Sequence, residues 1–313
     1  MKNGVWNPYE IRAEDSERLY MIKGGLAMTQ RTNHSKNVYI SREEVVGRIP
    51  LDDSISTTCV TNHIVEMTVM EKQISRKCGI KRLDKCHYVN LRTEEVCEFR
   101  HSVKNQRKNM NKSYTTLRRL INYNFTGNES ELHATLTYGE DMQSRDNVSA
   151  DFKAFWKRLK YAYPTCEYIV IYEPTEKGVW HVHVLIKDRN GKRLFIPKDR
   201  LSDMWRKGYV CVNRILDNDN IAAYFMGLFS DRNKEKSGSK KVERIPYYAN
   251  NYRLYSRSKG IKTPPLYKET YKQALERVKG LEPCFENAYG IYDSEDGTEL
   301  NVIYHKQYNK RRK

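Results

Sequence analysis

Hydrophobic and polar positions alternate most regularly between about residues 131 and 231. Strand-like stretches, rich in β-branched and aromatic residues, cover 132–138, 167–173, 179–186 and 209–215. Apolar residues at helical spacing cover 148–161, with Ser149 as the expected N-cap, and helices are also expected over 197–207 and 220–230. The order βαββαβα predicts an α+β fold with helices packed on a mainly antiparallel sheet.

The flanking regions are less regular. Residues 1–100 are polar and weakly periodic, with a strand-like stretch at 60–69, and we assign them no fold. Residues 101–122 predict a basic helix, and 232–313 form a basic, Tyr-rich extension that begins with a Lys/Gly/Ser-rich loop. The sequence therefore predicts an N-terminal region (1–100), a core domain (101–231) and a C-terminal extension (232–313).

The chain has 313 residues, of which 39% are hydrophobic and 30% charged, a composition typical of a soluble globular protein. No apolar run approaches the roughly 20 residues that a membrane helix needs. The first residues mix charged and apolar side chains, which argues against a secretory signal. We expect a cytoplasmic protein without membrane partners.

Charge narrows the choice of partner. The formal net charge is +17 with 23 tyrosines, and no acidic residue occurs between 99 and 128. An excess of basic charge interleaved with aromatic residues favours nucleic acid over an anionic membrane. The candidate DNA-contacting residues lie in two basic segments: Arg107, Lys108, Lys112, Arg118 and Arg119 in the first, and Arg257, Lys259 and Lys262 in the second.

The seven cysteines are odd in number and widely spread, which is typical of free thiols in a cytoplasmic chain. A zinc site is the alternative, with Cys78, Cys86 and Cys97 near His87 and His101. The absence of a C-x-x-C pair argues against a common zinc finger.

A candidate metal site lies in the predicted strand 179–186. Side chains alternate across a sheet, so His181 and His183 share one face. The connection 174–178 is short and contains a glycine, which predicts a β-hairpin that brings Glu173 near His181. Two imidazoles and a carboxylate suit Mn²⁺ or Mg²⁺. Glu176 is a competing ligand, and two histidines hydrogen-bonded on a polar sheet face are the simpler alternative.

A candidate nucleophile, Tyr224, lies in the predicted helix 220–230. Helical tyrosines more often belong to a core than to an active site. Here the small residues Ala222 and Ala223 leave space beside the ring, and the helix follows the last strand of a compact fold.

Three runs occur together: T-L-T-Y (135–138), E-P…G-x-W-H-V-H-V-L-I (173–186) and D-N-I-A-A-Y (219–224), followed by S-R-S-K-G-I-K-T-P (256–264). In order and spacing they resemble the motifs of HUH-superfamily rolling-circle replication initiators (Rep proteins) of plasmid and phage type, over roughly residues 100–270. The resemblance implies an HUH endonuclease-like fold, with a central antiparallel sheet flanked by helices. It also implies a divalent metal, Mg²⁺ or Mn²⁺, held by His181, His183 and Glu173.

In that family a helical tyrosine attacks the scissile phosphate. Carried over, Tyr224 forms a 5′-phosphotyrosine, leaves a free 3′-OH and allows the strand to be rejoined. The implied substrate is single-stranded DNA at a replication origin. No G-x-x-x-x-G-K-[ST] run occurs, so a helicase and a polymerase are expected from the host.

One departure concerns the residues after the tyrosine. Many relatives carry a Lys three residues on or a second Tyr at the fourth, where this chain has Gly227 and Leu228. A single-tyrosine mechanism is therefore implied, with Lys234 or Lys236 as the expected source of positive charge.

Other functions stay open at this point. A relaxase or a single-tyrosine transposase would use the same chemistry. A non-catalytic nucleic-acid-binding protein would need neither metal nor Tyr224, and a metallohydrolase with water as nucleophile would need His181 but not Tyr224.

Overall fold

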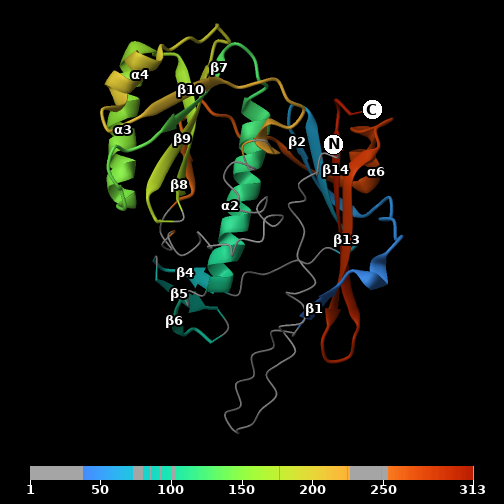
Figure 1. Cartoon of the computed structure of the whole chain (residues 1–313). Coiled ribbons are helices and arrows are strands. Elements are labelled where there is room, and N and C mark those ends of the chain that lie inside the picture. The colour runs from blue at the N-terminus through green and yellow to red at the C-terminus, as the bar shows by residue number, and fades with distance from the viewer. Residues whose placement is uncertain are drawn as a thin grey trace. The chain divides into compact units, whose positions relative to one another are not determined.

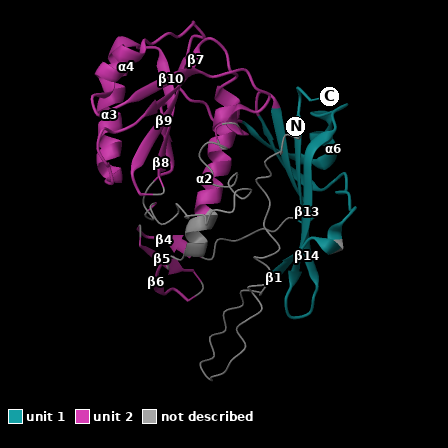
Figure 2. Cartoon of the chain, in the orientation of Figure 1, with its two compact units in different colours: residues 1–60, 64–74, 265–313 teal, residues 61–63, 75–264 magenta. Residues whose placement is uncertain are grey.

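The computed structural model describes residues 38–72, 80–84, 86–91, 93–99, 103–175, 177–223, 225, 248 and 253–312. The chain divides into two compact units (Figure 2). Unit 1 comprises Met1–Val60, Ile64–Ile74 and Pro265–Lys313, and unit 2 comprises Thr61–His63 and Ser75–Pro264. The division predicted from the sequence follows the chain, whereas unit 1 combines segments from both of its ends.

Unit 2 is built on a five-stranded antiparallel sheet. Its strand order is β10 (Val210–Arg214), β7 (Glu131–Leu136), β9 (Trp180–Asp188), β8 (Cys166–Pro174) and β11 (Tyr255–Arg257). With its helices this sheet confirms the α+β class. The pairing of β8 with β9 also confirms the hairpin expected from the short connection between them.

The helices of unit 2 are α2 (Val103–Asn124), α3 (Arg145–Ala162) and α4 (Lys198–Trp205). The expected cap of α3, Ser149, is wrong: the helix begins a turn earlier, where the Ser144 hydroxyl accepts a hydrogen bond from the backbone N–H of Asn147. Within the expected helix 220–230, residues 221–223 and 225 are described, and all four are helical.

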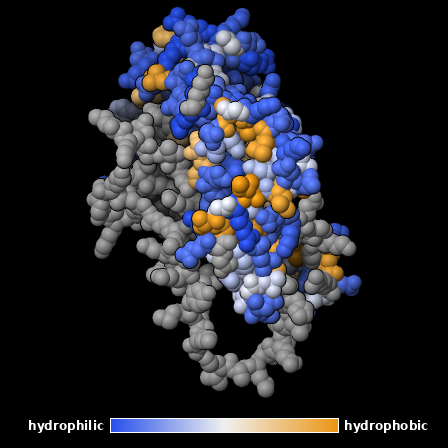
Figure 3. Space-filling view, turned by 90° about the vertical axis from the view of Figure 1, so that its right-hand side faces the viewer, coloured by the Kyte–Doolittle hydropathy of each residue, from blue (hydrophilic) through white to orange (hydrophobic). Residues whose placement is uncertain are grey.

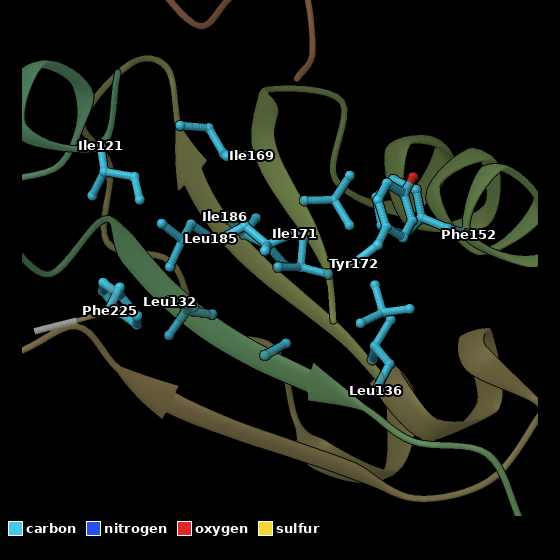
Figure 4. Packing of buried hydrophobic residues seen from close by; sticks show 14 of the residues in the cluster. Ile121, Leu132, Leu136, Phe152, Ile169, Ile171, Tyr172, Leu185, Ile186 and Phe225 are labelled. Carbon is cyan, nitrogen blue, oxygen red and sulfur yellow. The ribbon is translucent and has the colours of Figure 1, made fainter. Parts of the chain in front are cut away.

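The two faces of this sheet are covered by different helices (Figure 1). On one face, the Phe152 ring of α3 packs against Tyr168 and Tyr172 of β8. On the opposite face the alternating positions include Ile169 and Leu185, which are fully buried in the same core as Ile121 of α2 (Figure 4). The candidate histidines share the α2 face, because His183 and Leu185 lie two residues apart in β9.

A small three-stranded sheet also belongs to unit 2. It consists of β4 (Ile80–Arg82), β5 (His87–Asn90) and β6 (Val96–Glu98), and most of its side chains are exposed or half-buried. The Asp84 carboxylate lies 2.8 Å from Nδ1 of His87. The hydrogen bond from His87, with further ones from backbone N–H groups, lowers the pKa of Asp84 to about 2.

Unit 1 is a six-stranded antiparallel sheet with strands from both ends of the chain. The order is β1 (Val38–Ser41), β13 (Pro283–Asp293), β14 (Glu299–Asn309), β3 (Ile64–Met70), β2 (Ile55–Val60) and β12 (Leu266–Thr270). The strand-like stretch at 60–69 is divided between β2 and β3, which form a hairpin. The long β13–β14 hairpin then adds its second strand to β3.

The core of unit 1 lies between this sheet and α6 (Tyr271–Glu276), with the short 3₁₀ helix η1 (Glu43–Val45) beside it. Thr270 and Gln273 form a capping box that begins α6. Val69, Val302 and Tyr304 of the sheet are fully buried together with Ala274 of α6. On the face of unit 1 seen in Figure 3, hydrophobic side chains form small groups among hydrophilic ones.

Two further observations concern the described residues only. None of the described helices is both long and apolar enough to cross a membrane. The described cysteines (Cys59, Cys86, Cys97, Cys166, Cys211 and Cys284) are free thiols, in agreement with the expectation from their number and spacing.

Candidate active site

The candidate site lies on the α2 face of the five-stranded sheet, where three neighbouring strands present polar side chains. In the β8–β9 ladder Glu173 is directly opposite His181. In the β7–β9 ladder Thr135 is directly opposite His183. Since side chains directly opposite each other in an antiparallel pair lie on the same face, β7, β8 and β9 place these four residues together.

Glu173 and His183 are in direct contact. Oε2 of Glu173 lies 2.9 Å from Nε2 of His183, and their side chains are 14% and 13% exposed. The pair is therefore mostly buried and still reachable from solvent. His181, one strand position from His183 on the same face, is half-buried.

A third histidine, His133 of β7, belongs to the same cluster and was missed by the sequence analysis. Its Nε2 lies 3.4 Å from Nδ1 of His183, and the two rings are stacked with centroids 5.6 Å apart. Thr135 Oγ1 lies 3.3 Å from the same Nδ1. His133 is two residues before Thr135 in the predicted strand 132–138, so strand alternation could have placed it on this face.

Burial decides the charge of His133. Loss of solvation, followed by the proximity of His183, lowers the pKa of His133 to about 4. The ring is therefore a neutral imidazole at pH 7, with one nitrogen that donates and one that accepts a hydrogen bond.

The chain that follows β10 lies against this cluster. The backbone N–H of Ala222 donates to Oδ1 of Asn122 in α2 at 2.9 Å. The Phe225 ring is fully buried and meets the His133 ring edge-on, with centroids 4.9 Å apart. Tyr224 lies outside the described residues, as do Glu176, Gly227, Leu228, Lys234 and Lys236.

The donor chemistry of the cluster suits a divalent cation: a carboxylate and two imidazoles stand on adjacent strands in register. In the structure, however, Glu173 and His183 bond to each other. Among the described residues no group of three or more His, Cys, Asp or Glu side chains is arranged so that it could hold a metal ion. Of the alternative zinc ligands, Cys78 and His101 lie outside the described residues.

The candidate DNA-contacting residues differ in exposure. Lys112, Arg257, Lys259 and Lys262 are exposed and Arg119 is half-buried, whereas Arg118 is only 2% exposed. The side chains of Arg107 and Lys108 lie outside the described part of α2.

The two basic segments meet at the end of α2. Asn124 donates through Nδ2 to the carbonyl of Lys262 at 2.8 Å and accepts through Oδ1 from the N–H of the same residue at 2.9 Å. This double hydrogen bond joins parts of the chain that are more than a hundred residues apart. It places the loop that carries Lys259 and Lys262 beside the C-terminal end of the basic helix.

Comparison with known proteins adds one finding. Residues 131–233 match the family model of replication-associated proteins of the ORF2 type. No curated protein and no solved structure matches the chain. The match covers less than half of the chain, but it includes the whole histidine and glutamate cluster and the position of Tyr224. It is consistent with a replication initiator.

Proposed function

We propose that this protein initiates rolling-circle DNA replication by nicking single-stranded DNA with Tyr224, assisted by a divalent metal held by His181, His183 and Glu173. The observation that carries the proposal is the register of β8 and β9. It sets Glu173 opposite His181 and in contact with His183, inside the segment that matches a replication-associated family.

Each residue has a distinct role. His181, His183 and Glu173 bind the cation, Mg²⁺ or Mn²⁺, through two nitrogens and one oxygen. The bound cation supplies positive charge that stabilises the phosphate in the transition state and the phenolate of the attacking tyrosine. This help matters because a phenol, with a pKa of about 10, is a weak nucleophile at neutral pH.

The reaction is a transesterification. Oη of Tyr224 forms a bond to phosphorus while the bond between phosphorus and the 3′ oxygen breaks. The phenol loses its proton, and the departing 3′ oxygen takes one up to become a 3′-OH. The phosphate stays attached to the 5′ carbon of the downstream strand, so one ester replaces another and the reverse reaction rejoins the DNA.

Two surface features support a DNA substrate. Lys112 of α2 and Lys259 and Lys262 of the following loop are exposed on segments that Asn124 holds together. Exposed basic side chains of this kind bind the phosphate backbone without regard to sequence.

The test is covalent capture. The protein is mixed with Mn²⁺ and a pool of single-stranded oligonucleotides labelled at both ends, and products are separated on a denaturing gel. We expect an adduct that carries the 3′-side fragment, is absent with EDTA and is absent in Tyr224→Phe. The matched control is Tyr161→Phe, an exposed tyrosine of α3, which should form the adduct normally. Cleavage that persists in Tyr224→Phe would refute the proposal.

A further inference from the structure

His133 has contacts on two sides that the proposed function does not yet use. On one side its Nε2 lies 3.4 Å from Nδ1 of His183. On the other, its ring packs edge-on against Phe225, the residue that follows Tyr224 in the chain. His133 therefore touches both the candidate ligand set and the segment that carries the candidate nucleophile.

The contact with His183 is on the far side of that ring from Glu173. Glu173 lies at Nε2 of His183, and His133 and Thr135 lie at Nδ1. A histidine that binds a metal through one nitrogen needs a partner at the other, because that partner fixes the tautomer and the orientation of the ring. His133 and Thr135 occupy the place of this partner.

The contact with Phe225 fixes the other side. Asn122 holds the start of the helical segment through the N–H of Ala222, and His133 contacts the buried Phe225 ring three residues later. Tyr224 lies between these two anchors in the chain. A shift of about 1 Å in a nucleophile can cost about a hundredfold in rate, so such anchors bear directly on the reaction.

We propose that His133 is a positioning residue that joins the two halves of the site: it orients the His183 ring through Nδ1 and holds the chain beside Tyr224 through Phe225. This inference rests on the proposed function, since it takes His183 as a ligand and Tyr224 as the nucleophile. The alternative is a histidine that only fills the core, which would affect folding and nothing else.

The experiment uses the full chain with Mn²⁺ alone, and binding is followed by the loss of the free Mn²⁺ signal in electron paramagnetic resonance. His133→Phe keeps the ring against Phe225 and removes the nitrogens, whereas His133→Asn keeps polar groups near His183. Thr135→Val removes the other partner of Nδ1. His87→Asn is the matched control, because it removes an imidazole that also contacts a carboxylate, on the small sheet.

We expect His133→Phe to weaken Mn²⁺ binding about 10- to 100-fold, the usual cost of losing such a partner. His133→Asn should recover part of this loss, Thr135→Val should have a smaller effect, and His87→Asn none. In single-turnover reactions His133→Phe should slow adduct formation at saturating DNA, while the DNA concentration for half-saturation stays unchanged.

The outcomes separate the two proposals. If the wild-type protein neither binds Mn²⁺ nor forms an adduct, the proposed function fails before any variant is compared. If the wild type does both and every variant that melts like wild type matches it in affinity and rate, the role of His133 is refuted. If His133→Asn loses Mn²⁺ as completely as His183→Ala, His133 is itself a ligand, which also overturns the positioning role. Should His133→Phe not fold, His133→Asn and Thr135→Val decide the question.

Discussion

The two units of this protein are both antiparallel sheets with helical cover, and they differ in what their polar side chains do (Figure 2). In unit 1, charged groups are paired off for structure. Arg277 binds both carboxylate oxygens of Glu269, and Nζ of Lys306 lies 2.7 Å from Glu286. In unit 2, the imidazoles of His133 and His183 and the Glu173 carboxylate gather on one sheet face, between a hydrophobic core and solvent.

Their charges differ as well. Acidic side chains outnumber basic ones in the described residues of unit 1, whereas basic ones outnumber acidic ones in unit 2. The overall charge of +17 therefore does not describe the molecule evenly. A polyanion is expected to bind unit 2, which is also the unit with the candidate site. The comparison teaches that partner and chemistry belong to the same unit.

The largest expected effect concerns the histidines. His181→Ala should reduce adduct formation by about a hundredfold or more, as the loss of a group that stabilises transition-state charge does elsewhere. His305→Ala removes a histidine from the sheet of unit 1, where it lies 3.1 Å from Thr68, and should leave the rate unchanged. Rates measured on the same oligonucleotide decide this. An equal loss in both variants would place part of the chemistry in unit 1.

The next effect concerns stability. Phe152 is fully buried in the core of unit 2 and Met67 in that of unit 1. Phe152→Ala should lower the free energy of unfolding by about 3–5 kcal/mol and Met67→Ala by about 2–5 kcal/mol.

Because the described tryptophans (Trp156, Trp180 and Trp205) all lie in unit 2, urea unfolding followed by tryptophan fluorescence reports that unit. The two cores share no residue, so we expect Phe152→Ala to shift the midpoint and Met67→Ala to leave it in place. Equal shifts would show that the units unfold as one.

A smaller effect is expected from charge. Lys112→Glu should weaken binding of single-stranded DNA several-fold and reduce the slope of log affinity against log salt by about 0.7, the value for one phosphate contact on a single strand. Lys272→Glu, an exposed lysine of α6 in unit 1, is the matched control and should change neither. Titrations at several salt concentrations check both, and the same slope in wild type and Lys112→Glu would contradict the assignment.

The smallest effect concerns single thiols. Burial, with the nearby Asp188 carboxylate, raises the pKa of Cys166 in unit 2 to about 12, so the reactive thiolate is scarce at pH 8 and increases only toward that pKa. Cys59 of unit 1 is also fully buried, whereas Cys211 is exposed. Iodoacetamide should label Cys211 quickly at pH 8 and the other two only when their units open. Mass spectrometry of each peptide therefore compares the units. Equal labelling of Cys166 and Cys211 would contradict the packing of β8.

The regular middle of the chain was predictable from local pattern. The strands β7 to β10 and the helices α3 and α4 lie where alternation and helical spacing place them, because each element buries one face and exposes the other. The hairpin followed from a short glycine-containing connection, and with it the position of Glu173 opposite His181. The exception was the start of α3, where Ser144 rather than Ser149 caps the helix.

Sequence alone thus determined the α+β class, the basic character and the pair of candidate imidazoles, since all three depend on composition or on neighbours in the chain. Only the tertiary structure decided that β3 pairs with β14, that Asn124 holds Lys262, and that His133 contacts both His183 and Phe225. These contacts join residues dozens to hundreds of positions apart. No local periodicity encodes such pairs, because they form only when whole sheets and helices bury their apolar faces together.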